Sequence, residues 1–330
     1  MTREIWAKLR KTRATMGWGI LCWCLLACAS SAEDPPRLGP EAPRSAAPSK
    51  APAARPHAGV ARLASVQQAP VSRDVEAVLA AQRALAPYVI EVVDPPDVYR
   101  IPQAARPLLS TLHRALFTYI EARLPGLLAA PHTGGDALGK ALRGPLEHGG
   151  VRSGFESQSF GSLLGIHVSL HPGALVGVVI AVSASCGSDS TLFLFSTQTP
   201  QLRHVLTAAA GRRRSLRDAQ FGLDYALLPS PQGGDPEVVV AFVNPWCSSA
   251  WRTLNYAVLT PTRDPWKPKR RLEREDSVWI GNGFARLDAG PGWFELGYDS
   301  WDTVGGNVVA PKRTRFEARA SGWTPVPTLR

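Results

Sequence analysis

A change of hydrophobic period near residue 155 constrains the fold of this chain more than any other feature. Beyond it, apolar residues alternate with small or polar ones, at Leu164, Ile166, Val168 and Leu170. A period of two is typical of a half-buried antiparallel strand. Further strand-like runs, mostly separated by turn residues, follow at 175–184, 191–196, 202–207, 221–228, 237–244, 252–260, 277–287, 292–298 and 314–320. Residues 155–330 are therefore predicted to form an antiparallel β domain.

A weak internal repeat with a spacing of about 60 residues runs through this region. Residues 178–195 combine an apolar strand, a turn with Cys and Ser, and a second strand, and 238–258 follow the same plan. A third copy without the cysteine spans 293–316. Repetition at this period is typical of propeller blades or stacked hairpins, and a closed propeller typically needs at least ~4 blades. We expect stacked hairpins, with a propeller-like arrangement or a β-sandwich as alternatives.

Residues 72–150 have the apolar spacing of helices instead. Ser72 is a suitable N-cap for a first helix. A second helix is expected from residue 107 until Pro125 ends it, and a third, short helix over 136–143. The expected fold class is α+β and mostly β, with a small N-terminal helical subdomain followed by the β domain.

The first 32 residues have the order of features of a bacterial export signal. A basic stretch precedes a largely apolar run that ends in small residues. Residues 25–28 resemble a lipobox and predict lipid attachment at Cys28, whereas residues 30–32 resemble an ordinary cleavage site. We expect an exported lipoprotein anchored to a membrane of the cell envelope. Soluble secretion or a periplasmic location, and an uncleaved signal anchor, are the alternatives.

Residues 33–71 are rich in Pro and Ala and poor in large apolar side chains. Such a segment cannot bury enough surface to offset the entropy lost on ordering, so a disordered tether is expected. The chain is thus divided into an export signal (1–32), a tether (33–71), a helical subdomain (72–150) and a β domain (155–330).

The net charge of +10 is unevenly divided between the leader and the rest of the chain. Of 37 basic and 27 acidic residues, 32 and 26 lie beyond Cys28, which leaves a net charge of +6 there. This modest excess argues against a nucleic-acid partner. Basic groups at 212–217, 267–271 and 312–315 favour an anionic envelope polymer or a protein as the partner.

Two of the five cysteines, Cys186 and Cys247, lie outside the leader region, each after an apolar strand-like run. In an oxidising compartment this pair predicts a disulfide, with two buried free thiols as the alternative. Their spacing does not suggest a metal site.

All tryptophans beyond the leader lie between Trp246 and Trp323. Amphipathic aromatic side chains are enriched at binding surfaces, and they also favour strands and β cores. The candidate ligand-binding residues are Trp251, Trp266, Trp293 and Trp301.

The sequence provides no catalytic signature, and no cofactor or metal is expected. It contains no nucleophile elbow, P-loop, dinucleotide-binding glycine pattern or His-Glu-x-x-His motif. His167 and His171 lie four residues apart on an expected strand, about 13 Å from each other, which is too far for joint chelation. We expect a non-enzymatic binding or assembly module. An envelope hydrolase acting on glycan or ester bonds is the alternative.

Overall fold

The computed structural model describes residues 72–326, except 90, 94–97, 131–133, 155–159, 185–187, 199–200, 210–221, 230–233, 244–250, 280–285 and 303–307. This part contains three helices and three four-stranded antiparallel sheets, together with one two-stranded sheet. The predicted α+β, mostly β fold is therefore confirmed.

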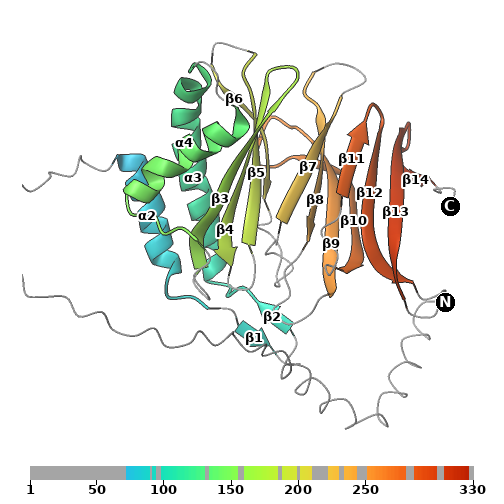
Figure 1. Cartoon of the computed structure of the whole chain (residues 1–330), viewed down its shortest axis with the longest axis horizontal. Helices are drawn as coiled ribbons and strands as arrows, with labels where there is room; N and C mark the ends of the chain where they lie inside the picture. Colours follow the sequence, from blue (N-terminus) through green and yellow to red (C-terminus); the bar gives the residue numbers. More distant parts are fainter. Residues whose placement is uncertain are drawn as a thin grey trace, which may run out of the picture. The chain divides into compact units, whose positions relative to one another are not determined.

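The helices precede the large sheets in the chain. They are α2 (Arg73–Leu85), α3 (Ala105–Leu128) and α4 (Gly135–His148). The short strands β1 (Glu91–Val93) and β2 (Val98–Arg100) pair between α2 and α3. Each helix places a stripe of buried apolar residues on one side, so each needs a partner surface. That surface is one face of the first sheet (Figure 1).

Each large sheet is a meander of consecutive strands. The first sheet consists of β3 (Phe160–His171), β4 (Leu175–Ala184), β5 (Ser188–Ser196) and β6 (Arg203–Ala209). The second consists of β7 (Gly222–Leu228), β8 (Glu237–Val243), β9 (Trp251–Thr260) and β10 (Lys269–Trp279). The third consists of β11 (Arg286–Gly290), β12 (Trp293–Asp302), β13 (Val308–Arg319) and β14 (Gly322–Val326).

The sequence repeat marks the central hairpin of each sheet. Its three copies at 178–195, 238–258 and 293–316 fall on β4–β5, β8–β9 and β12–β13. In every sheet these two strands are flanked by an edge strand on either side. The repeat is visible at the centre because the central strands bury apolar residues, on both faces in the first sheet and on one face in the third.

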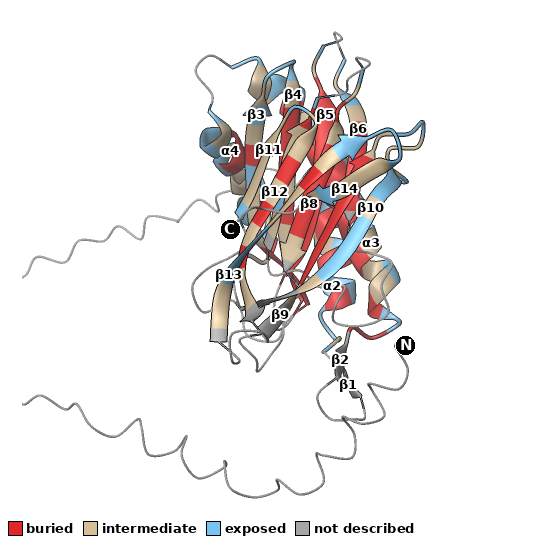
Figure 2. Ribbon diagram, turned by 90° about the vertical axis from the view of Figure 1, so that its right-hand side faces the viewer, coloured by how far each residue is buried: buried red, intermediate tan, exposed pale blue. Residues whose placement is uncertain are grey.

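The helices and sheets form successive layers joined by three apolar cores (Figures 1 and 2). The core under the helices contains Phe193 and Phe195 of β5, while Leu192 and Leu194 of the same strand enter the core shared with the second sheet. All nine residues of β5 are buried. The third core joins the second and third sheets and includes Phe294.

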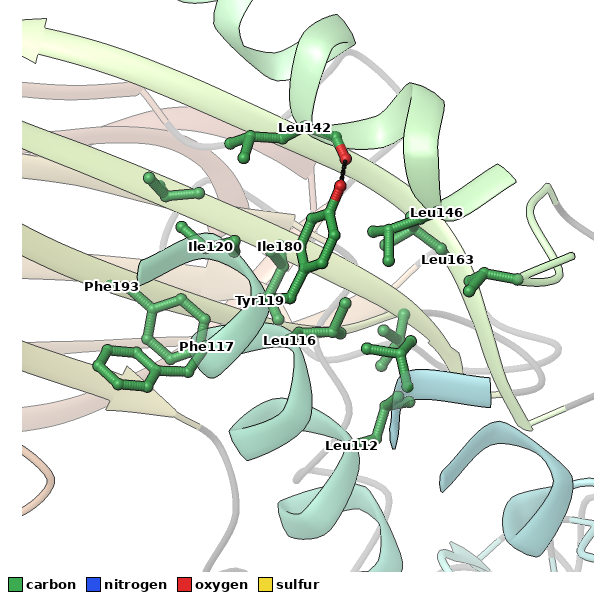
Figure 3. Close-up of a cluster of buried hydrophobic side chains, with 14 of the residues drawn as sticks. Leu112, Leu116, Phe117, Tyr119, Ile120, Leu142, Leu146, Leu163, Ile180 and Phe193 are labelled. Atoms are coloured by element: carbon green, nitrogen blue, oxygen red, sulfur yellow. Dashed lines mark hydrogen bonds between the residues drawn. The ribbon is translucent and has the colours of Figure 1, made fainter. Parts of the chain in front are cut away.

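The hydroxyl of Tyr119 is buried in the core under the helices, where it has a hydrogen-bond partner. The Tyr119 side chain lies among the leucines of the helical core, and its hydroxyl donates a 2.7 Å hydrogen bond to the Leu142 carbonyl of α4 (Figure 3). This bond satisfies a polar atom that would otherwise be costly to bury.

A shared carboxylate connects the second and third sheets. Asp276 of β10 accepts hydrogen bonds from the hydroxyls of Tyr256 (3.2 Å) and Tyr298 (2.7 Å). Lys312 of β13 donates to its other oxygen at 3.1 Å. Burial and the neighbouring carboxylate raise the pKa of both tyrosines, so the hydroxyls remain protonated donors.

Several sequence expectations differ from the structure. Pro125 does not end α3, which continues to Leu128. The proline lies in the last turn on an exposed side, and Leu127 and Leu128 beyond it still pack on the core. The third helix was expected over 136–143, whereas α4 continues to His148. The run at 277–287 spans the end of β10 and the start of β11, and β2, most of β10 and β14 were not expected. All three of these strands are sheet edges, which commonly carry charged residues or proline.

Glycine at position 139 allows α4 to lie against β3, which gives a first prediction. An added Cβ there would lie 2.6 Å from the Ile166 carbonyl oxygen, whereas one at Gly126 of α3 would meet no atom within 4 Å. Gly139→Ala is expected to lower the free energy of unfolding by about 1–3 kcal/mol, because helix and strand must separate. Gly126→Ala is expected to leave it unchanged or raise it by up to about 1 kcal/mol.

Chemical denaturation followed by circular dichroism measures both values. Equal stabilities for the two variants would show that α4 does not approach β3 this closely.

Candidate functional site

A partly open pocket of about 270 Å³ lies where α3, β6 and the second sheet meet. We call it the interlayer pocket. Its lining residues are Ser110, His113, Arg114, Thr207, Ala208, Val240, Phe242, Ala257, Leu259, Trp266, Lys267, Pro268, Arg270 and Glu273. The strap, residues 261–268 between β9 and β10, supplies one wall.

The strap is fixed to the first sheet by a backbone bond and an aromatic contact. The Thr207 N–H of β6 donates a 2.7 Å hydrogen bond to the Pro265 carbonyl. The Trp266 ring then packs edge-on against Phe117 and His204, with ring centroids 5.1 and 5.5 Å apart. The strap therefore connects the second sheet to α3 and β6 and forms one side of the pocket.

The mouth of the pocket is positively charged. Arg114, Lys267 and Arg270 are exposed cations in its lining, against a single carboxylate, Glu273. Arg270 pairs with Glu273, and Lys267 pairs with Asp264 at 3.0 Å. Within the described part of the chain the Arg114 guanidinium makes no direct ion pair and lies 5.5 Å over the Trp266 ring.

The floor of the pocket is apolar. Its aliphatic residues belong to the core between the first and second sheets and are at most 7% exposed: Ala208, Val240, Ala257 and Leu259. Phe242 adds a partly buried ring. The pocket therefore combines a buried apolar floor with an exposed cationic mouth.

A buried polar cluster lies beside the floor. His113 of α3 places Nδ1 3.2 Å from the Thr191 hydroxyl and Nε2 3.4 Å from an Asp189 carboxylate oxygen, both on β5. The side chains of His113 and Asp189 are each 4% exposed. Burial lowers the pKa of His113 to about 4, so the ring is neutral at pH 7.

The polar contacts of this cluster connect α3 to β5. Both ring nitrogens of His113 face β5, and Thr191 is completely buried, so neither is presented to a substrate as a base or a nucleophile. Ser110, the serine in the pocket lining, is 3.2 Å from the Arg106 carbonyl and donates to it. A working nucleophile–base pair would need a hydroxyl that is both directed at a ring nitrogen and open to a substrate. Ser110 is not directed at one, and Thr191 and Thr207, which lie beside ring nitrogens of His113 and His204, are buried.

The structure places the candidate tryptophans in different surroundings. Trp266 lines the interlayer pocket and directly precedes the basic group 267–271. Trp293 lies on β12, outside the pocket lining, with the Arg315 guanidinium 4.3 Å over its ring. Trp251 and Trp301 belong to β9 and β12, and their side chains lie outside the described residues. These ligand-binding assignments remain predictions.

Other predicted features lie where the structure does not describe the chain. Cys28, with the export signal and tether, and the proposed disulfide partners Cys186 and Cys247 are outside the described residues. In the described part, no group of three or more His, Cys, Asp or Glu side chains is suited to hold a metal ion. None of the helices described is both long and apolar enough to cross a membrane.

Sequence reasoning did not identify Arg114 or His113 as parts of the site. Both lie on α3, whose apolar spacing predicts a helix but does not show which element each side faces. The basic residues after Trp266 were the only indication of a cationic pocket. Comparison with protein-family models and with curated protein sequences finds no match.

The buried histidine predicts a specific pH dependence of stability. In the unfolded chain His113 binds a proton below about pH 6.5, whereas the folded protein resists protonation down to about pH 4. The unfolded state therefore binds more protons in this window, and stability falls as the pH falls. His113→Gln is expected to remove up to about 3 kcal/mol of the loss between pH 7 and pH 4.

Urea unfolding at a series of pH values measures this difference. His148→Gln, at an exposed histidine at the end of α4, is the control and should retain the wild-type slope. A wild-type slope in His113→Gln would contradict the assigned protonation state.

Proposed function

We propose that this protein is an exported, lipid-anchored envelope protein and a non-enzymatic binding module. It binds an anionic group of an envelope polymer or protein partner in the interlayer pocket. The observation that carries the proposal is the Arg114 guanidinium, which lines the pocket, lies over Trp266 and makes no direct ion pair within the described residues. A cation held this way can form charge-assisted hydrogen bonds with a ligand without first breaking a salt bridge.

The surrounding charges support the same proposal. Three cations line the mouth, against the carboxylate of Glu273 in the lining and that of Asp264 beside Lys267 and Arg114, so the local balance is still positive and favours an approaching anion. Trp266 fixes one wall of the pocket, which lowers the ordering cost of binding.

The envelope location is proposed from the leader and the tether. Lipid attached at Cys28, followed by a Pro-rich tether over 33–71, would hold the folded part up to on the order of 100 Å from a membrane. We expect the mature chain to begin with an acylated Cys28 when intact mass is measured. An unmodified Glu33 at the N-terminus would contradict the anchor and favour soluble secretion.

The second candidate function is the envelope hydrolase. The observation that favours it is the close approach of His113 and Asp189 beside a pocket that also contains Ser110. The ring nitrogens face β5 rather than Ser110, so we rank this function second. Hydrolysis of ester or glycan substrates by the protein, abolished in a folded Ser110→Ala variant, would reverse the ranking.

Binding to a matched pair of polymers tests the proposed function. Dextran sulfate is expected to bind and neutral dextran is not, with binding weakened by salt. Arg114→Gln is expected to weaken dextran sulfate binding about tenfold, equivalent to ~1.4 kcal/mol. Arg83→Gln removes an exposed cation of α2 outside the pocket lining and is expected to change it less than twofold. Equal effects of both variants would show that the pocket is not the anion site.

A further inference from the structure

We infer that the interlayer pocket binds an amphiphilic anion, an aliphatic chain of about eight carbons attached to an anionic group. The chain would occupy the apolar floor, and the anionic group would lie at the mouth beside Arg114, Lys267 and Arg270. This inference rests on the proposed anion-binding function and narrows its ligand to one chemical class.

The floor excludes a ligand that is polar on all sides. Val240, Ala257 and Leu259 present hydrocarbon, and the polar groups near them already have protein contacts. The Thr207 hydroxyl lies 2.8 Å from His204 Nε2, and the His113 ring faces Asp189 and Thr191. A sugar or a peptide amide placed there would lose its hydrogen bonds to water and find no replacement.

The mouth determines where the charge of the ligand lies. The three cations of the lining are exposed, while the aliphatic floor residues are buried. An anion without a tail would contact only this outer ring and leave the floor empty. A neutral chain would fill the floor and leave the cations unused. An amphiphile matches both parts of the pocket, and an acyl chain does so without introducing amide groups.

The size of the pocket limits the chain. The cavity volume of about 270 Å³ covers the apolar floor and the charged mouth together. A chain of about eight carbons fits this space, whereas longer chains must extend into solvent. Each buried methylene is expected to increase affinity about fourfold until the floor is full.

Calorimetric titration of the folded protein with hexanoate, octanoate, decanoate and dodecanoate tests the inference. Affinity should rise about fourfold per methylene up to about eight carbons and then level off. Binding should show a negative heat-capacity change, which is the sign of apolar burial. Octanol and acetate, which have only the chain or only the charge, should each bind at least tenfold more weakly than octanoate.

Two variants distinguish the contribution of the charged mouth from that of the apolar floor. Arg114→Gln should weaken octanoate binding about tenfold and leave octanol binding unchanged, because it alters only the charged mouth. Ala257→Leu, which fills the floor, should shorten the optimal chain by two or three carbons. If Ala257→Leu does not fold, the chain-length series on the wild-type protein still decides the question. Arg83→Gln is again the matched control.

The outcomes distinguish this inference from the proposed function. Dextran sulfate binding that depends on Arg114, together with no octanoate binding, would overturn the amphiphile and keep the anion site. Octanoate binding with no dependence on chain length would also overturn the amphiphile. No Arg114-dependent binding of any anion would overturn both. An acetylated tripeptide ending in leucine that binds more tightly than octanoate would identify a protein terminus as the ligand instead.

Discussion

The first sheet is buried on both faces, and the rest of the described structure depends on this constraint. In β5, phenylalanines at 193 and 195 enter the core under the helices, and leucines at 192 and 194 enter the core shared with the second sheet. A strand of this kind is unstable unless both faces are covered. The helices supply one cover and the second sheet the other, which is why these layers of different secondary structure form one compact unit.

The interlayer pocket follows from the way these two covers meet. At the β6 edge of the first sheet, α3 approaches the strap, and Trp266 packs against Phe117 between them. The apolar floor is a continuation of the core between the two sheets, and the cations lie on the elements that border it. A core that opens at its edge beside positive charge provides both halves of an amphiphile-binding site. None of the third-sheet residues that the structure describes lines the pocket.

The sequence predicted the central strands of the first and second sheets, whose residues are constrained from both sides, and also the helices and β3, whose apolar residues repeat along one side. The central hairpins β4–β5 and β8–β9 were recognised because coverage on both faces selects continuous apolar runs. Edge strand β10 was not recognised, since one of its edges is unpaired and its residues are largely charged. In the site, Trp266 and its basic neighbours were adjacent in sequence and could be grouped. Arg114 joins them only through the tertiary fold, which no local pattern encodes.

Native-state hydrogen exchange followed by mass spectrometry tests the dependence on the first sheet most directly. If burial of β5 on both faces holds the layers together, amides of β5, of the middle of α3 and of β9 should exchange through one opening, with the free energy of global unfolding. That result would make α3 and the second sheet a single cooperative unit and the pocket a fixed feature of it. Exchange of α3 at a much lower free energy, with β5 still fully protected, would contradict the account.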